Sequence, residues 1–246
     1  MEAARHAGAQ VINFLRARAW ARVRALPRIM LRHVFTALLS AALADAALAP
    51  QRVFCYGDSL TAGTSPPLDE LYPYAPVLER ALGSTTAMVR HRGLPGATAE
   101  MMLQCADDEQ RGLRSVLVKA SPDLAIILAG TNDLGYNSES EPIVRALCGL
   151  HELAHDVNVP TLAVSIPPSA YQAMQSEAAE LAILVNRELR AWCSERGPMC
   201  AFVEHPITRW DKDDGLWAPD GLHFSPEGYR VLGEGLADAV RERLDR

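Results

Sequence analysis

Six consecutive apolar residues, from Leu124 to Ala129, restrict the possible folds of this chain more than any other segment. A run of this length is typical of a strand, and a strand without polar alternation must be covered on both faces. Other apolar or β-branched segments predict four further strands, at residues 52–56, 85–91, 161–166 and 199–203. Helices are expected between and after the strands, at residues 73–82, 98–117, 142–157, 176–196 and 226–244. This alternation predicts an α/β fold with helices on both faces of a five-stranded parallel sheet.

The strand–helix pattern occupies residues 51–246, which we interpret as one domain with a substantial core. Two of its helices are preceded by Thr98 and Ser225, and we expect these residues to act as N-caps. The domain is acidic, because residues 51–246 contain 17 basic and 28 acidic side chains. Nucleic acid is therefore an unsuitable partner, since its phosphates must be neutralised by Lys and Arg.

Residues 1–50 have a different composition, with seven arginines and only two acidic side chains. The apolar stretch 34–44 is too short to span a bilayer, which takes about 20 residues, so no stable membrane span is expected. With the small residues 46–49 after it, the stretch fits a signal-peptide core, whereas the Arg-rich lead also fits an organelle transit peptide. An extra helix or a tail is the alternative. We interpret this extension as a targeting segment and leave its destination open, beside a soluble mature domain.

The five cysteines are odd in number and include no CxxC pair. This pattern predicts neither a disulfide framework nor a zinc ribbon. Small buried thiols in a reducing compartment are the favoured interpretation. Whether Cys193 and Cys200 pair is left open by the sequence.

Four short polar or glycine-rich segments follow predicted strands, at residues 57–60, 93–96, 130–133 and 220–223. The first contains Ser59, and the last contains His223 with Asp220 three residues before it. The middle two offer a glycine N–H and an asparagine amide. A nucleophile, a base, a group that orients the base and oxyanion donors are the parts that acyl transfer needs. Because ligands bind at the carboxyl ends of parallel strands, we expect the four segments to meet at one sheet edge.

These segments resemble the four blocks of the SGNH (GDSL) hydrolase family, in order and across residues 53–230. The resemblance implies a flavodoxin-like three-layer α/β/α fold and hydrolysis of esters or thioesters. Its named residues correspond here to Ser59, Gly96, Asn132 and His223. We therefore expect a serine hydrolase that cleaves carboxylic esters of small or medium acyl groups, without metal or organic cofactor. A thioesterase or lysophospholipase acting at the same site is the alternative, and the oligomeric state is unknown.

The expected mechanism assigns one role to each side chain. Ser59 attacks the acyl carbonyl, His223 moves the proton, and Asp220 holds the imidazole in the required tautomer. The oxyanion is expected to meet the N–H groups of Ser59 and Gly96 and the amide of Asn132. We expect glycine at position 96 because a side chain there would shield its N–H.

Further positions are predicted from their neighbourhood alone. The segments 134–141 and 167–175 follow strands, so Tyr136 and Tyr171 are candidates for lining the substrate pocket. Trp217 precedes the Asp–His pair and is a third candidate, although packing of the final loop is at least as good an explanation. Asp58 and Asp133 are expected to brace their loops rather than react.

One motif predicts a different chemistry. His151, Glu152 and His155 match HExxH, which in zinc peptidases provides two metal ligands and a general base. The strand expected after this helix brings no third ligand, so we treat a zinc hydrolase as the weaker hypothesis.

Overall fold

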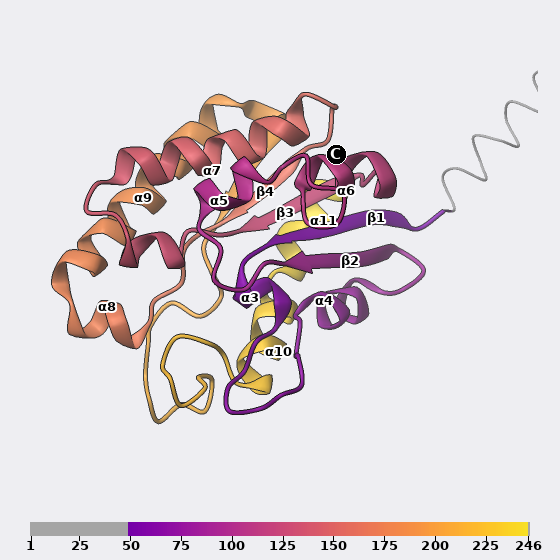
Figure 1. Ribbon diagram of the computed structural model, residues 1–246. Coiled ribbons are helices and arrows are strands. Elements are labelled where there is room, and N and C mark those ends of the chain that lie inside the picture. The colour runs from indigo at the N-terminus through magenta and orange to yellow at the C-terminus, as the bar shows by residue number, and fades with distance from the viewer. Residues whose placement is uncertain (1–48, 246) are drawn as a thin grey trace, which may run out of the picture. The chain divides into compact units, whose positions relative to one another are not determined.

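The structure is a computed structural model that describes residues 49–245 (Figure 1). The targeting segment predicted for residues 1–50 therefore falls outside the described residues, apart from its last two positions. Within the described part of the chain, no helix combines the length and the apolar character that crossing a membrane requires.

Five parallel strands form one sheet in the order β2-β1-β3-β4-β5, which confirms the predicted fold class. The strands are β1 Gln51–Gly57, β2 Ala87–Gly93, β3 Leu124–Leu128, β4 Thr161–Val164 and β5 Cys200–Val203. In such an order the chain changes direction across the sheet between β1 and β3, and a crevice for ligands opens there. The last residue of β1, Gly57, pairs with Gly93 of β2 and Leu128 of β3. The loops that follow these three strands therefore start at the same level of the sheet.

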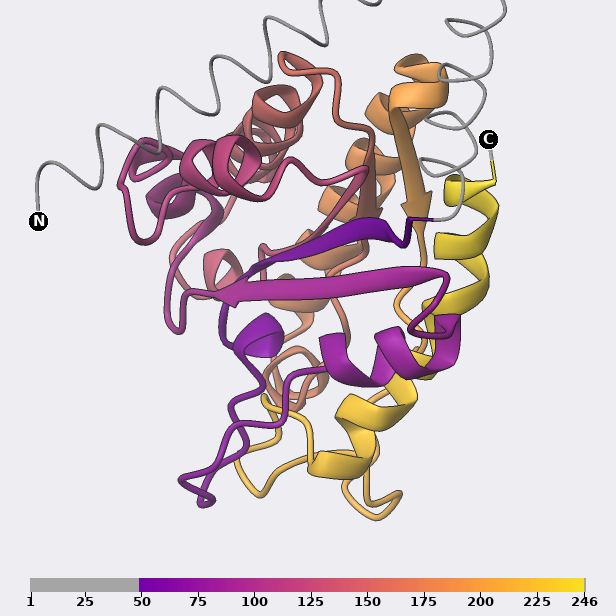
Figure 2. The same cartoon turned by 90° about the vertical axis from the view of Figure 1, so that its right-hand side faces the viewer.

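Helices cover both faces of the sheet (Figures 1 and 2). One layer contains α5 Ala99–Gln104, α6 Leu113–Ala120, α7 Ser140–His155 and α9 Ser176–Glu195. The other contains α4 Ala75–Leu82, α10 Pro226–Gly235 and α11 Ala237–Leu244. Short helical turns lie along the connections: α3 Ser59–Ala62, η1 Asn132–Gly135, α8 Ala170–Met174 and η2 Gly197–Met199.

The central strand β3 contributes to two separate hydrophobic cores. Ala125 and Ile127 belong to the core beneath α5, α6, α7 and α9. Leu124, Ile126 and Leu128 belong to the core shared with α4, α10 and α11. Because successive side chains of a strand point to opposite faces, both sets must be apolar. This two-sided burial is the physical reason for the uninterrupted apolar run in the sequence.

Two helices that the sequence predicts as continuous are divided. The helix expected at 98–117 becomes α5 and α6, because the Asp108 carboxylate accepts hydrogen bonds from the N–H groups of Gln110 and Arg111 at 2.9 and 2.8 Å. Such local side-chain bonds compete with the helical pattern. The helix expected at 226–244 breaks after Gly235 into α10 and α11.

The helix starts are confirmed at both predicted caps. Thr98 Oγ1 accepts the N–H of Met101 at 3.2 Å, and Ser225 Oγ accepts the N–H of Gly228 at 3.1 Å. The segment 167–175 is not a simple loop, because it contains α8, which Ser169 caps by accepting the N–H of Gln172. Ser169 is itself a sequence signal for a helix start.

Candidate active site

Ser59 lies directly beyond β1, at the first position of α3. The strand can pass close to β3 because residue 57 is glycine: a Cβ there would lie 1.9 Å from the Leu128 carbonyl oxygen. Asp58 then caps α3, with its Oδ1 accepting the N–H of Leu60 at 2.8 Å. A close strand contact and a capped turn thus hold Ser59 at the carboxyl edge of the sheet.

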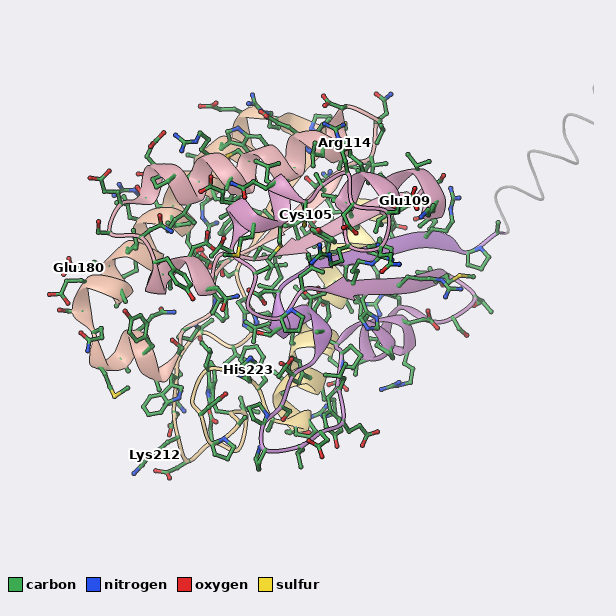
Figure 3. The ribbon with its side chains drawn as sticks, viewed as in Figure 1. Cys105, Glu109, Arg114, Glu180, Lys212 and His223 are labelled. Carbon is green, nitrogen blue, oxygen red and sulfur yellow. The ribbon has the colours of Figure 1, made fainter. Side chains whose placement is uncertain are left out.

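His223 lies on the loop that precedes α10 and is labelled in Figure 3. Its Nε2 is 2.9 Å from Ser59 Oγ, and its Nδ1 is 2.6 Å from Asp220 Oδ2. The other oxygen of Asp220 accepts the backbone N–H groups of Leu222 and His223, each at 3.0 Å. The carboxylate therefore binds both the ring and the backbone of the histidine, which fixes the direction of the imidazole.

The environment of Asp220 favours its ionised form. Partial burial acts to raise its pKa, but the hydrogen bonds from the His223 side chain and from the backbone N–H groups of His223 and Leu222 outweigh it. The pKa of Asp220 is consequently lowered from its ordinary value. An ionised carboxylate on Nδ1 leaves Nε2 as the ring atom that faces the Ser59 hydroxyl.

Gly96 and Asn132 lie on the loops that follow β2 and β3. Asn132 Nδ2 donates one hydrogen bond to the Ala97 carbonyl at 2.9 Å, which links the two loops and orients the amide. Among the described residues, neither the Ser59 N–H nor the Gly96 N–H donates a hydrogen bond. Unused donors at this edge are the kind of group that can meet a developing negative charge.

The structure gives a second reason for glycine at position 96, beside the expected shielding of its N–H, which stays a prediction. A Cβ at this position would meet no heavy atom within 4 Å, so there is space for a side chain. The backbone φ of +77° is what favours glycine, because residues with a Cβ rarely adopt that conformation.

Two buried carboxylates hold the site loops, in the way expected from the sequence. Both oxygens of Asp133 accept the N–H of Ala99, at 3.1 and 3.0 Å, and so join η1 to the start of α5. Asp58 caps α3 as described above. Burial raises the pKa of both carboxyls, and that of Asp58 reaches about 7.

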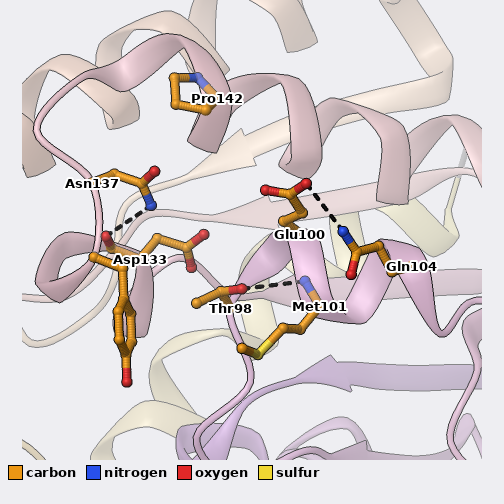
Figure 4. Close-up of a pocket in the computed structure, with 8 residues that line it drawn as sticks. Thr98, Glu100, Met101, Gln104, Asp133, Asn137 and Pro142 are labelled. Atoms are coloured by element: carbon orange, nitrogen blue, oxygen red, sulfur yellow. Dashed lines mark hydrogen bonds between the residues drawn. The ribbon is translucent and has the colours of Figure 1, made fainter.

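Two pockets border the loops that carry Gly96 and Asn132. The first, of about 340 Å³, is lined mainly by polar side chains and is shown in Figure 4; its residues are Thr98, Glu100, Met101, Gln104, Asp133, Tyr136, Asn137 and Pro142. The second, of about 480 Å³, is lined by Leu94, Pro95, Gly96, Ala97, Met101, Cys105 and Arg111. Met101 lines both pockets.

Of the three residues predicted to line the substrate pocket, Tyr136 lines one of the two pockets described above. Tyr136 lines the first pocket, together with Glu100 and Gln104 of α5, which sequence reasoning missed. The sequence places Glu100 and Gln104 four residues apart on an expected helix, and therefore on the same face of it. It does not indicate that this face borders a pocket. Tyr171 lies on α8 at 43% exposure and lines neither pocket.

Trp217 is a core residue and not an exposed pocket wall. Its side chain is only 9% exposed, and its ring packs 4.8 Å from the ring of Phe224. The same two residues also form a backbone bridge. The tryptophan therefore packs against the loop that carries His223 and stabilises it. This agrees with the second interpretation of Trp217 from the sequence, as a residue that packs the final loop.

The glutamate of the HExxH motif lies apart from its two histidines. His151 is fully buried in α7, whereas Glu152 is exposed and forms an ion pair with Arg196 at 3.5 Å. His155 Nε2 lies 3.0 Å from Thr161 Oγ1. Within residues 49–245, no group of three or more His, Cys, Asp or Glu side chains is arranged to hold a metal ion. The zinc hypothesis therefore lacks a ligand set in the described structure.

Comparison with known proteins places the chain among ester hydrolases. The GDSL-like lipase/acylhydrolase family matches residues 55–231, whereas no curated protein sequence gives a significant match. Many solved structures share the fold, and three of them serve as examples. A GDSL-like lipase from Bacteroides thetaiotaomicron is 20% identical, with a TM-score of 0.59 over 82% of this chain and 95% of that one. A family 3 carbohydrate esterase from Clostridium thermocellum is 18% identical, with a TM-score of 0.62 over 80% and 98% of the two chains. A lipase/acylhydrolase from Enterococcus faecalis is 22% identical, with a TM-score of 0.57 over 78% and 96%.

Proposed function

The chain belongs to the GDSL-like lipase/acylhydrolase family and is a hydrolase that acts on esters, and from this premise we propose that it works through an acyl-enzyme on Ser59. One observation supports this proposal above the others. Ser59 Oγ, the two ring nitrogens of His223 and the Asp220 carboxylate form a continuous chain, with contacts of 2.9 and 2.6 Å. Ser, His and Asp side chains that are far apart in the sequence rarely form such a chain of contacts for structural reasons alone.

In the proposed reaction, Ser59 Oγ attacks the carbonyl carbon of the ester while His223 Nε2 takes the hydroxyl proton. The tetrahedral oxyanion is stabilised by the N–H groups of Ser59 and Gly96 and by the second amide hydrogen of Asn132. His223 then returns the proton to the departing alcohol. Water repeats the same steps in reverse, and the carboxylic acid leaves with Ser59 restored.

We propose esters of small or medium acyl groups as substrates. The two pockets beside the Gly96 and Asn132 loops, of about 340 and 480 Å³, provide room for such a molecule. The polar lining of the first pocket, with Glu100 and Gln104, suits a leaving group that carries hydroxyls better than a long alkyl chain. One of the similar solved structures is a carbohydrate esterase, which supports a leaving group of this kind.

A panel of p-nitrophenyl esters of increasing chain length, with matched acyl thioesters, tests both the reaction and the acyl preference. Ser59→Ala is expected to reduce kcat by at least about 10³-fold with unchanged folding, because the variant lacks the hydroxyl that attacks the ester. The exposed Ser84, in the turn before β2, offers a matched control, and Ser84→Ala should retain full activity.

Labelling with an alkyl phosphonate fluoride adds a direct readout of the nucleophile. Mass spectrometry should place the adduct on Ser59 and nowhere else. Normal turnover by Ser59→Ala, or a phosphonate adduct on a different side chain, would reject the proposed mechanism.

A further inference from the structure

Two cysteines far from Ser59 lie against each other. Cys193 is in the last turn of α9, and Cys200 is the first residue of β5. Their sulfur atoms are 2.8 Å apart, and the side chains are 1% and 4% exposed. Because Cys200 begins its strand, the pair lies at the amino edge of the sheet, whereas Ser59 lies at the carboxyl edge. The catalytic proposal has no use for this pair.

The histidines of the HExxH motif lie beside the same thiols. Thr161 Oγ1 is 3.4 Å from Cys200 Sγ and 3.0 Å from His155 Nε2. The ring of His151 is fully buried, stands 6.4 Å from that of His155, and has no hydrogen-bond partner on either nitrogen among the described residues. Both histidine rings of the motif therefore lie close to the thiol pair.

The thiols are electrostatically unequal. The pKa of Cys200 is lowered, first by the hydrogen bond with Cys193 and further by His151 and His155, although burial opposes the shift. The same hydrogen bond and burial raise the pKa of Cys193. A thiolate is the reactive form of cysteine, so Cys200 is the sulfur that reacts first.

We propose that Cys193 and Cys200 form an oxidisable dithiol, which a hydroperoxide converts reversibly into a disulfide. A disulfide bond is about 2.05 Å long, so the two sulfur atoms need only a short approach. Six residues separate the cysteines along the chain, and both side chains face the core beneath α7 and α9. Burial excludes bulky thiols, and the 2.8 Å separation makes each sulfur the first partner of the other.

The reaction balances in two steps. The Cys200 thiolate attacks one oxygen of hydrogen peroxide, the O–O bond breaks, and Cys200 becomes a sulfenic acid, while the departing hydroxide takes up the proton that the Cys200 thiol gave up and leaves as water. Cys193 sulfur then attacks the sulfenic sulfur, the S–O bond breaks, and the thiol proton leaves with the hydroxyl as water. In total two thiols and one peroxide yield one disulfide and two waters.

Peptide mapping tests the proposal on the full-length protein. Trypsin cuts after Arg190, Arg196 and Arg209, so Cys193 and Cys200 fall in the separate peptides 191–196 and 197–209. After a mild excess of hydrogen peroxide, alkylation of free thiols and digestion without reductant, we expect these two peptides to appear covalently linked. Dithiothreitol should separate them. The Tm should rise by roughly 5 °C on oxidation and fall again with dithiothreitol, because the bridge restricts the unfolded chain.

Matched variants assign the effect. Cys105→Ser removes a more accessible thiol and should leave the linked peptides and the reversible Tm rise intact. Cys200→Ser should abolish both. Turnover of p-nitrophenyl acetate should change less than twofold on oxidation, because the bridge lies at the opposite sheet edge. Ester turnover is measured independently of the linked peptides and the Tm. A failure of the dithiol proposal can therefore be distinguished from a failure of the proposed esterase mechanism.

Three results would overturn the assignment. The first is oxidised protein in which peptides 191–196 and 197–209 remain unlinked. The second is linkage of either cysteine to Cys148, the third buried thiol of the same core. The third is stoichiometric zinc in the purified protein that protects both thiols from peroxide until a chelator removes it.

Discussion

The proposed role of Asn132 depends on how its side-chain amide is held. One amide hydrogen is held by the Ala97 carbonyl at 2.9 Å, and this bond sets the plane of the amide. We propose that the second hydrogen binds the oxyanion of the substrate. A donor that is already oriented needs no reorganisation when negative charge develops, which is the main advantage of an oxyanion hole.

We therefore expect Asn132→Ala to lower kcat by roughly 100- to 1,000-fold, because it removes a donor used mainly in the transition state. The KM should change by less than about threefold. Steady-state kinetics on the best p-nitrophenyl ester measures both. Asn158→Gly, between α7 and β4, is the matched control and should leave kcat unchanged. A raised KM with normal kcat would show that Asn132 acts in ground-state binding instead.

At the scale of elements, α3 depends on a capping residue in an unusual environment. Asp58 is fully buried, and only its Oδ1 has a hydrogen-bond partner among the described residues. Burial raises the pKa of this carboxyl from an ordinary value of 3.8 to about 7. The folded protein is therefore more stable when this carboxyl is protonated, because the cost of burying the charge exceeds the gain from the Leu60 N–H, which by itself favours the ionised form.

The consequence is a pH dependence with a definite sign. Between pH ~4 and ~7 the folded state holds a proton on Asp58 that the unfolded state has already lost, so this group makes stability fall as pH rises. Asp58→Asn keeps an acceptor oxygen but cannot ionise. We expect urea unfolding to show the variant gaining stability relative to the wild type between pH 4.5 and pH 8.

Asp58→Ala serves as the control for the cap itself. It should lose about 1 kcal/mol at low pH, because the N–H of Leu60 loses its acceptor. Parallel pH profiles for the wild type and Asp58→Asn would contradict the buried, protonated state.

The element boundaries also show where local patterns are insufficient. The helices at 98–117 and 226–244 have favourable sequences throughout, yet each is divided in the structure. At Asp108 the cause is local, since its carboxylate bonds to two backbone N–H groups just beyond it. A turn of this kind replaces helical hydrogen bonds with bonds from a side chain, so the helix loses little when it stops there. The spacing of apolar residues in the sequence does not reveal such bonds.

For the whole molecule, the sheet order explains why motifs distant in sequence share one site. The strands β1, β2 and β3 end level with one another, and the loops beyond them carry Ser59, Gly96 and Asn132. His223 arrives on a separate loop before α10. All of these lie within residues 51–246, which we propose as the catalytic domain.

A chain that lacks residues 1–50 is therefore expected to keep kcat/KM within about twofold of the full chain, because no proposed catalytic group lies in the removed part. Circular dichroism and ester hydrolysis of the two proteins provide the comparison. Ser59→Ala in the shortened chain is the negative control. Loss of folding or of activity on truncation would show that the domain boundary is placed wrongly.

The sequence by itself determined the strand–helix order, the two-sided burial of residues 124–128, the caps at Thr98 and Ser225, and the four motif segments. These features depend on periodicity and on contacts within a few residues, which a linear pattern records directly. Only the tertiary structure decided the 2.9 Å contact between Ser59 and His223, which joins residues 164 positions apart. It also decided the burial of Trp217 and the meeting of the HExxH histidines with Cys193 and Cys200. Contacts of this kind arise from the packing of helices against the sheet, and the side-chain directions that produce them are set by the whole core rather than by neighbouring residues.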